Sequence, residues 1–529
     1  MIRAKEPPRG NGMWRWIGFS LLLLVAIIAA TVEVVLHRAE PILKGRVIET
    51  LSTRFDSRVE LDSFHVSVTK GLEVSGDGLR IYPPDDVVEA GANAPLISLA
   101  HFTFHGNIAG LFAKPMRIET VNVHGMTISI PPREMRQQAV KGERHIGKIR
   151  IIVNGINFED SKLIIGTAKP DKDPKEFDLQ HIVMHNVGPD DAWRYDATLI
   201  NAIPTGDIHA MGTFGPWINE SPGDSAVTGK YTFDNADLNT IKGVAGILSS
   251  TGEFSGQLNH ITVDGTTETP DFALDTAGRA MPLHTKFHAI VDGTSGDTYL
   301  QPVEAKLQQS EFSCVGAIIN VKGKGHIIDL DVHVPDGRIQ DFLDLAIKAR
   351  PALMTGRLNM KTKLHIRPGD ESVTQKLDLN GSFKLKAIHF SNPEWQDKID
   401  MLSLRARGEA KEAKPGAEDV PSQMSGSFTM QASKLRFSKL AYALPGADIN
   451  LTGVYSLDGN QLDFDGKVRT KAALSQMVAT WWKSWLLKPV DPFFRKHGAG
   501  AEIPVKISGS KGEPKFGLDL RQKGKDKGE

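Results

Sequence analysis

Apolar and polar residues alternate along many short stretches of the chain from about residue 58 onward. Phe102 and Phe104, for example, are separated by Thr103 and flanked by histidines. A period of two places successive side chains on opposite faces of a β-strand, so these stretches predict strands with one apolar face and one wet face. The residues that we expect on the apolar face are Phe102, Phe104, Val121, Val123, Ile128, Ile130, Leu330, Val332, Val334, Phe516 and Leu518.

Two glycines interrupt the alternation and shift its phase. After Gly125 the apolar positions resume one residue out of step, and Gly155 interrupts the next alternating segment in the same way. A glycine inside a strand pattern is typical of a bulge or a tight turn. We therefore expect the strands to bend at both glycines.

Glycine-led segments recur in the second half of the chain. "GSFKLKAIHF" begins at Gly381 and "GSFTMQASKLRF" at Gly426, with shorter versions at Gly356 and Gly453. The spacing favours a repeating unit of about 25 residues, which suits a pair of strands. Such openings also recur by chance in antiparallel proteins, so an ordinary antiparallel sheet is the alternative.

Apolar spacing of three to four residues predicts a few helices. Residues 37–57 carry apolar side chains every fourth position and predict an amphipathic helix that packs on the membrane surface or on the first strands. Shorter helices are predicted at 238–248 and 339–346, between strands.

A longer helix is predicted at 471–497, with Trp481, Trp482 and Trp485 on or beside its apolar stripe. It either caps the end of the sheet or meets a membrane or partner protein, since tryptophan beside lysine suits the headgroup region. We expect strands again at 498–520 and a disordered tail at 521–529.

The N-terminal residues predict a membrane anchor. Basic residues in segment 1–13 and at Arg15 precede an uncharged run from Trp16 to Val32. Segment 14–36 is long enough for one tilted span, and the positive flank keeps residues 1–13 in the cytoplasm. A cleaved signal peptide is the alternative, but no clean small-residue cleavage site follows the run. An uncleaved anchor would place the rest of the chain across the membrane, in the periplasm of a Gram-negative bacterium.

A long sheet with one apolar face must cover that face, and the chain offers few amphipathic helices to do so. Three arrangements solve the problem: a closed sandwich, a barrel, or a curled groove filled by an apolar ligand. The sequence alone leaves these three open.

Composition narrows the class of function. The 63 Lys and Arg residues balance 63 Asp and Glu residues, which disfavours nucleic-acid binding. The single cysteine, Cys314, excludes disulfides within the chain and cysteine-rich metal sites. No nucleotide-binding loop, nucleophile elbow or zinc-protease motif occurs, so we expect neither an enzyme nor a cofactor.

Three pairs of histidines are spaced four residues apart, at 101/105, 181/185 and 284/288. On a helix such a pair can chelate zinc. In a strand, four residues span about 13 Å, so we expect ordinary histidines and no metal site.

The chain resembles AsmA-family proteins over most of its length. The resemblance is carried by "PILKGRVIETLSTRF" after the anchor, by residues 95–132 ("PLISLAHFTFHGNIAGLFAKPMRIETVNVHGMTISIPP"), by "GEFSGQLNHITVDGTTETPDF" and by the ending "GAGAEIPVKISGSKGEPKFGLDL". It implies an inner-membrane anchor, a periplasmic repeating β-groove with a hydrophobic floor, and a role in phospholipid movement or outer-membrane homeostasis. The family is in turn similar to bridge-like lipid-transfer proteins.

The expected fold is therefore mainly β: an elongated, curled antiparallel sheet over residues 58–470 with a few short helices. The first functional hypothesis is a groove that conducts glycerophospholipids between inner and outer membrane, with membrane lipids as its ligands and an outer-membrane or periplasmic protein as a further partner. The second is a periplasmic scaffold that influences outer-membrane protein assembly and carries no lipid.

Overall fold

A computed structural model describes residues 40–479 and 500–518 of the chain, with short gaps. The gaps are residues 43, 50, 54–56, 68–71, 90, 92, 107–115, 132–150, 167–174, 189, 217, 219–220, 322–323, 349, 370, 458 and 511–512. The expected anchor (14–36), Trp481, Trp482, Trp485 and the C-terminal tail lie outside the described residues. Among the helices that are described, none has the length and hydropathy required to cross a bilayer.

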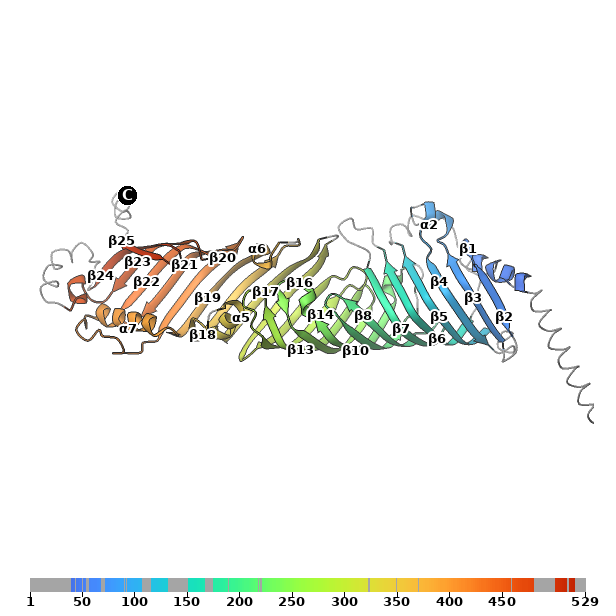
Figure 1. The fold of residues 1–529 in the computed structure, drawn as a ribbon, viewed down its shortest axis with the longest axis horizontal. Helices are drawn as coiled ribbons and strands as arrows, with labels where there is room; N and C mark the ends of the chain where they lie inside the picture. The colour runs from blue at the N-terminus through green and yellow to red at the C-terminus, as the bar shows by residue number, and fades with distance from the viewer. Residues whose placement is uncertain are drawn as a thin grey trace, which may run out of the picture. The chain divides into compact units, whose positions relative to one another are not determined.

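The chain divides into two units, and each is considered by itself. The first consists of Met1–Ala168, Glu176–Leu199 and Thr213–Ser221, and the second of Lys169–Lys175, Ile200–Gly212 and Pro222–Glu529. Both are built almost entirely from strands, as the alternating pattern predicts (Figure 1).

The first unit is a mixed sheet with a helix before its first strand and a second short helix, α2 (Asp85–Glu89). Its strands are β1 (Val59–Glu60), β2 (Ser63–Ser67), β3 (Leu72–Ile81), β4 (Ile97–Gly106), β5 (Met116–Ile130), β6 (Ile151–Ile165) and β7 (Lys175–Val187), followed by β8 (Trp193–Ala202) and β9 (Thr205–Phe214), within which the boundary between the units falls.

Strands β1 to β5 pair antiparallel, but β5 and β6 run parallel, with Val121 opposite Ile156. The expectation of a purely antiparallel sheet is thus wrong at this point. A parallel pair needs a connection of a dozen or more residues to return the chain to the same end, and residues 131–150 supply that length.

The N-terminal helix packs on the first strands. Residues 40–42, 44–49 and 51–53 are helical, and Val47, Ile48 and Leu51 lie against a cluster of buried apolar residues. The cluster consists of Val59, Leu61, Phe64, Val74, Leu79 and Ile81. Of the two surfaces considered for this helix, the strands therefore receive its apolar stripe.

Strands of the second unit follow one another antiparallel in chain order from β12 onward, with β10 beside β12. They are β10 (Ala226–Asp237), β11 (Val244–Ala245), β12 (Ile247–Gln257), β13 (His260–Leu274), β14 (Met281–Val291), β15 (Thr298–Leu307), β16 (Ser310–Val321), β17 (Gly325–Arg338), β18 (Met354–Ile366), β19 (Leu377–Phe390), β20 (Ser422–Gln431), β21 (Lys434–Leu444), β22 (Ala447–Ser456), β23 (Leu462–Thr470), β24 (Ala501–Gly509) and β25 (Pro514–Leu518).

Helical segments of this unit occur only where strands end. They are η1 (Pro222–Asp224), η2 (Leu238–Thr240), α5 (Ile339–Ala346), α6 (Val373–Lys376), α7 (Pro393–Arg407) and η3 (Leu474–Met477). We call the edge formed by the strand ends next to α5 and α7 rim 1, and the opposite edge, which carries α6, rim 2.

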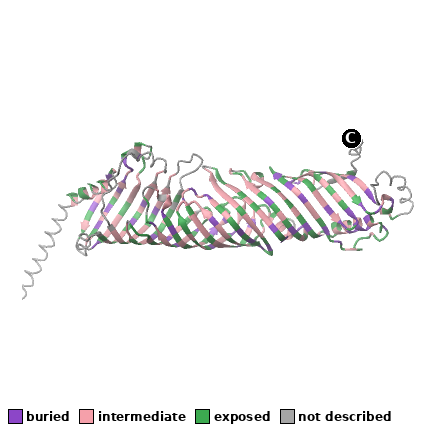
Figure 2. Cartoon of the chain, turned by 180° about the vertical axis from the view of Figure 1, so that it is seen from behind, coloured by how far each residue is buried: buried purple, intermediate pink, exposed green. Residues whose placement is uncertain are grey.

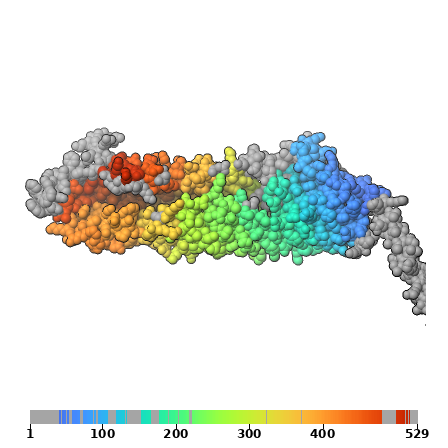
Figure 3. Space-filling model, in the orientation of Figure 1, coloured from blue at the N-terminus to red at the C-terminus, as the bar shows by residue number. Residues whose placement is uncertain are grey.

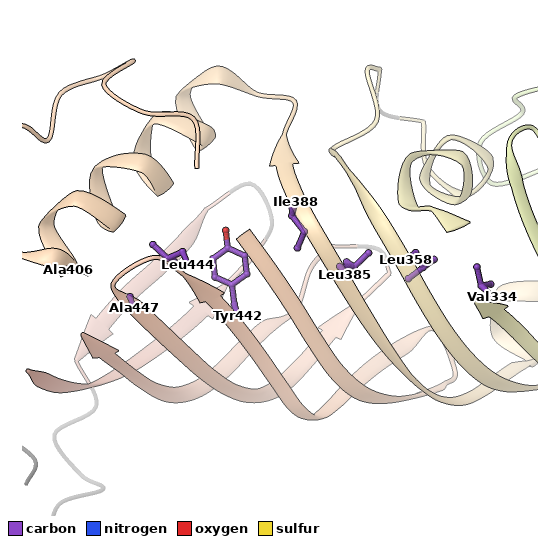
Figure 4. Packing of buried hydrophobic residues seen from close by; sticks show 8 residues of the cluster. All are labelled: Val334, Leu358, Leu385, Ile388, Ala406, Tyr442, Leu444 and Ala447. Carbon is purple, nitrogen blue, oxygen red and sulfur yellow. The ribbon is translucent and has the colours of Figure 1, made fainter. Parts of the chain in front are cut away.

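The best-buried core of the second unit lies under α5 and α7. It contains Val334, Leu358, Leu385, Ile388, Ala406, Tyr442, Leu444 and Ala447. Figure 4 shows Leu385 and Ile388 on β19 next to Leu358 on the adjacent strand β18, with Tyr442 and Leu444 beneath α7. We call these eight residues the covered cluster.

Two helix predictions differ in outcome. The helix predicted at 339–346 is confirmed as α5. At 238–248 only the single turn η2 forms, and strand β12 begins at Ile247, because Gly243 and Gly246 adopt positive φ angles that end the helix. At the start of the helix predicted over 471–497, η3 ends at Val478 in an extended conformation.

The glycine repeats also resolve in part. Gly356, Gly381 and Gly426 lie on the successive strands β18, β19 and β20, whereas Gly453 lies two strands further, on β22. Only the interval from Gly426 to Gly453 is a pair of strands. The intervals of 25 residues (Gly356 to Gly381) and 27 residues (Gly426 to Gly453) are thus similar in length but span different numbers of strands, so the spacing does not mark a constant structural unit.

Candidate functional site

The apolar residues of the second unit line up across strands. Val332 on β17 lies opposite Cys314 on β16 and Thr362 on β18, and Leu330 lies opposite Leu364. The same register of apolar residues continues from Leu364 on β18 to Leu379 on β19, and then across β20 to β24. Because opposed residues of neighbouring strands point to the same side, these rows form one continuous apolar face.

Away from rim 1 most side chains of this apolar face are only partly buried, and none belongs to the covered cluster. The exceptions are Thr362, Phe428, Met430 and Phe464, which are buried. We call the partly buried side chains of this region the open floor, and Figure 2 shows how residues of intermediate burial recur along the strands. It comprises Leu330, Val332, Leu364, Leu379, Leu435, Phe437, Leu440, Leu451, Tyr455, Leu462 and Ile507. A set of large apolar side chains that share one face and keep contact with solvent is typical of a binding surface.

Glycines on the floor make room for aromatic rings of the neighbouring strand. A Cβ atom on Gly453 would lie 2.6 Å from Cδ1 of Phe464, and one on Gly426 would lie 3.0 Å from Cε1 of Phe383. The rings therefore lie across the glycines and fill the gaps that missing side chains would leave. This close approach explains why two of the repeated glycines occur where they do.

The opposite face of the same strands is polar and exposed. Lys363 pairs with Asp331 at 3.0 Å, and Lys506 on β24 pairs with Asp465 on β23 at 3.1 Å. The hydrogen bond and charge of Asp465 raise the pKa of the Lys506 ammonium. Such cross-strand ion pairs suit a face that stays in contact with water.

Rim 1 is closed by α7, which polar contacts hold in place. Asn392 caps its first turn, Gly408 ends it with φ 93°, and the Ser403 hydroxyl donates to the Pro445 carbonyl at 2.8 Å. Asp400, 1% exposed, accepts from the Val420 backbone N–H at 3.0 Å. A helix fixed by such buried bonds is a permanent cover for its end of the strands.

Between the rims the surface is hollowed. Figure 3 shows a trough in the orange and red strands of the second unit, between the edge that carries α7 and the opposite edge. The part of the open floor that these strands carry therefore lies along the bottom of a groove.

Cys314 lies within the apolar row, opposite Val332. Burial raises the pKa of its thiol above the ordinary value of 9.0. A raised pKa lowers the share of reactive thiolate, so this cysteine acts as a small apolar side chain of the same face, one strand away from the open floor.

The residues predicted for the apolar face fall into three groups. Leu330 and Val332 lie on the open floor, and Val121 and Ile128 are partly exposed in the first unit. Val334 (0% exposed) and Val123 (7%) are buried, and Phe102 and Phe104 pack against the cluster beneath the N-terminal helix. The side chains of Ile130, Phe516 and Leu518 lie outside the described residues.

Most of the open floor was missed by the sequence analysis. Leu377, Leu379, Phe383 and Leu385 alternate along β19, and only Gly381 breaks their run. Counting Gly381 as an apolar position would have extended the alternation through the whole strand. The sequence segments first recognised as repeats thus carry the floor.

Two of the three pairs of spaced histidines, 101/105 and 284/288, lie beside carboxylates of the neighbouring strands. His101 lies 2.7 Å from Asp77, and His284 lies 2.6 Å from Glu268, each on the neighbouring strand. Hydrogen bonds from Ser63 and then His101 lower the pKa of Asp77. Among the described residues, no three potential metal ligands cluster.

Comparison of the chain with protein-family models, with curated proteins and with solved structures found no match.

Proposed function

We propose that the chain binds glycerophospholipids by their acyl chains along the open floor and conducts them between the inner and outer membranes. In this proposal an N-terminal helix anchors the protein in the inner membrane, with the bulk of the chain in the periplasm. The activity contributes to outer-membrane assembly and homeostasis, as the resemblance to AsmA-family proteins implies.

The continuity of the apolar face supports this proposal most strongly. Apolar side chains follow one another across eight strands, β17 to β24, while charged pairs occupy the other face. On β20 the face is formed by the buried Phe428 and Met430, and on the other seven strands residues of the open floor belong to it. Each CH₂ group of an acyl chain that moves from water onto such a surface gains about 0.8 kcal/mol. An acyl chain along the floor would be buried while its headgroup stays in water at the open side of the groove.

The mechanism we propose is passive and needs no catalysis. The floor lowers the cost of removing an acyl chain from a bilayer, and the rows of opposed residues offer equivalent positions along the groove. Direction would come from a lipid gradient or from a partner protein.

Photo-crosslinking in the full chain tests the proposal. Benzoylphenylalanine at Val332 should form adducts with phospholipid that mass spectrometry detects after irradiation of intact cells. The matched position is Lys363, which lies on the exposed face of the neighbouring strand. Adducts at Val332 and none at Lys363 support the groove. Absence of lipid adducts at Val332, Leu379 and Ile507 together would contradict it and favour a scaffold that carries no lipid.

A further inference from the structure

Two segments from opposite rims touch each other in the second unit. Gly243 lies in the turn between η2 and β11 at rim 1, and Val373 is the first residue of α6 at rim 2. A Cβ atom built on Gly243 would come 2.5 Å from Cγ2 of Val373 and 3.2 Å from its Cβ. The two residues are therefore in direct contact.

This contact crosses the groove. β18 has 13 residues, so its two ends, one at each rim, are about 40 Å apart along the strand. Rim-to-rim contact at this point requires the sheet from β12 to β18 to curl nearly into a ring. Because Asp331 and Lys363 on the polar face stay exposed, the polar face lies on the outside of this ring and the apolar face on the inside.

Each side of the contact is anchored in its own rim. The N–H group of Gly243 donates to Asp275 Oδ2 at 3.2 Å, and the Asp275 N–H donates to the Gly243 carbonyl at the same distance. On the other side, the Ser433 hydroxyl donates to the Thr374 carbonyl at 3.1 Å. The contact itself brings the glycine against the side-chain carbons of Val373.

Apolar side chains remain exposed beside this contact. Ile241 is 37% exposed and Ile247 is 44% exposed, and they flank Gly243 on both sides in the sequence. The turn thus offers apolar surface to a ligand that would lie between the separated rims.

We propose that Gly243 and Val373 form a gate that must open for a phospholipid to enter the ring from β12 to β18. The inference rests on the proposed function. A phospholipid needs an open slot above the floor, because burying its charged headgroup without partners is costly. Where the rims touch, the slot is closed, so lipid reaches Leu330 only when Gly243 and Val373 separate. Ile507, on β24 outside the ring, is loaded in either state.

A reversible disulfide across the gate tests this. The full chain would carry Cys314→Ser with Gly243→Cys and Val373→Cys, whose Cβ atoms lie near the spacing of about 3.5–4.5 Å found in disulfides. Benzoylphenylalanine replaces Leu330 in one preparation of this protein and Ile507 in another. Purified protein in each redox state is mixed with phosphatidylglycerol vesicles that contain a fluorescent-acyl phospholipid, irradiated, and assayed for labelled adducts.

The gate predicts that oxidation abolishes labelling at Leu330 and leaves Ile507 unchanged, and that reduction restores Leu330. Equal labelling of Leu330 in both redox states overturns the gate while keeping the lipid groove. Absence of labelling at both positions after reduction overturns the proposed function and the gate with it.

A second variant avoids the strain of a side chain at Gly243, whose φ is 94°. Val373→Ala removes the two methyl groups that meet the glycine and should raise labelling at Leu330. Gln375→Ala, on the same helix, is the matched control and should leave it unchanged. Unaltered labelling of Leu330 in Val373→Ala would contradict the gate independently of the disulfide.

Discussion

Val332 and Val334 lie two residues apart on β17 and point to the same face of the sheet, yet they occupy different environments. Val334 is fully buried in the covered cluster, whereas Val332 is partly exposed on the open floor. The difference does not arise in the strand, whose alternation treats both residues alike. It arises because α5 and α7 follow the strand ends at rim 1 and reach only part of the face.

The comparison teaches that one apolar face serves two purposes. Near rim 1 it supplies the stability of the unit, because helices bury it. Away from rim 1 it supplies a surface that can be wetted or occupied by a ligand. Substitutions of the same kind at the two places should therefore separate folding from binding.

The largest effect is expected for Val334→Asp. A carboxylate in the covered cluster would have no partner, and burying an unpaired charge costs more than about 4 kcal/mol. We expect the variant to unfold or to be strongly destabilised in equilibrium urea unfolding of the full chain. Val332→Asp is the matched variant. It should stay folded, and benzoylphenylalanine at Leu379 should then form fewer adducts with lipid. Similar urea midpoints for the two variants would contradict this division of the face. They would mean that Val332 and Val334 are either both buried or both exposed.

Part of this division could be predicted from the sequence. Alternation identified the strands and the apolar face, and the spacing of residues 339–346 identified α5. The cover over rim 1 was missed because α7 has a mixed polar sequence with no clear apolar stripe. Its ends were readable nonetheless, since Asn392 and Pro393 start the helix and Gly408 stops it.

Bends in the strands were predicted in one case and missed in another. Gly125 has φ 63°, which turns Val123 and Met126 to the same side, as the phase shift indicates. On β6 the positive φ occurs at Asp160 and not at Gly155. Asp adopts this conformation less readily than glycine, so only the packing of neighbouring strands reveals it. Contact between the rims at Gly243 was likewise beyond any local pattern, since it depends on how far the sheet curls.

An intermediate effect is expected when a leucine is shortened to alanine at the two places. Leu385 is 5% exposed in the covered cluster, and Leu385→Ala should lower the free energy of unfolding by about 3 kcal/mol, because the cavity that it leaves cannot close. Leu379 lies on the open floor of the same strand, and Leu379→Ala should lower the free energy of unfolding by about 1 kcal/mol, since solvent already reaches this leucine. Urea unfolding of both variants measures the ratio. Equal losses would mean that the floor is packed as tightly as the covered cluster.

The smallest effect is expected for Tyr442→Phe. The buried Tyr442 hydroxyl donates to Ser422 Oγ at 2.8 Å, and its loss should cost about 1 kcal/mol at neutral pH. Burial raises the pKa of Tyr442 above its ordinary value of 10.0, so its contribution is fully present below pH 10 and is lost as the pH rises toward the folded-state pKa. The difference in unfolding free energy between the wild-type chain and Tyr442→Phe should therefore shrink above pH 10. Tyr455→Phe, on the open floor, is the control and should change stability less at neutral pH. A difference between wild type and Tyr442→Phe that stays constant from pH 7 to above pH 10 would show that α7 does not shield this hydroxyl, and that the covered cluster is as open as the floor beside it.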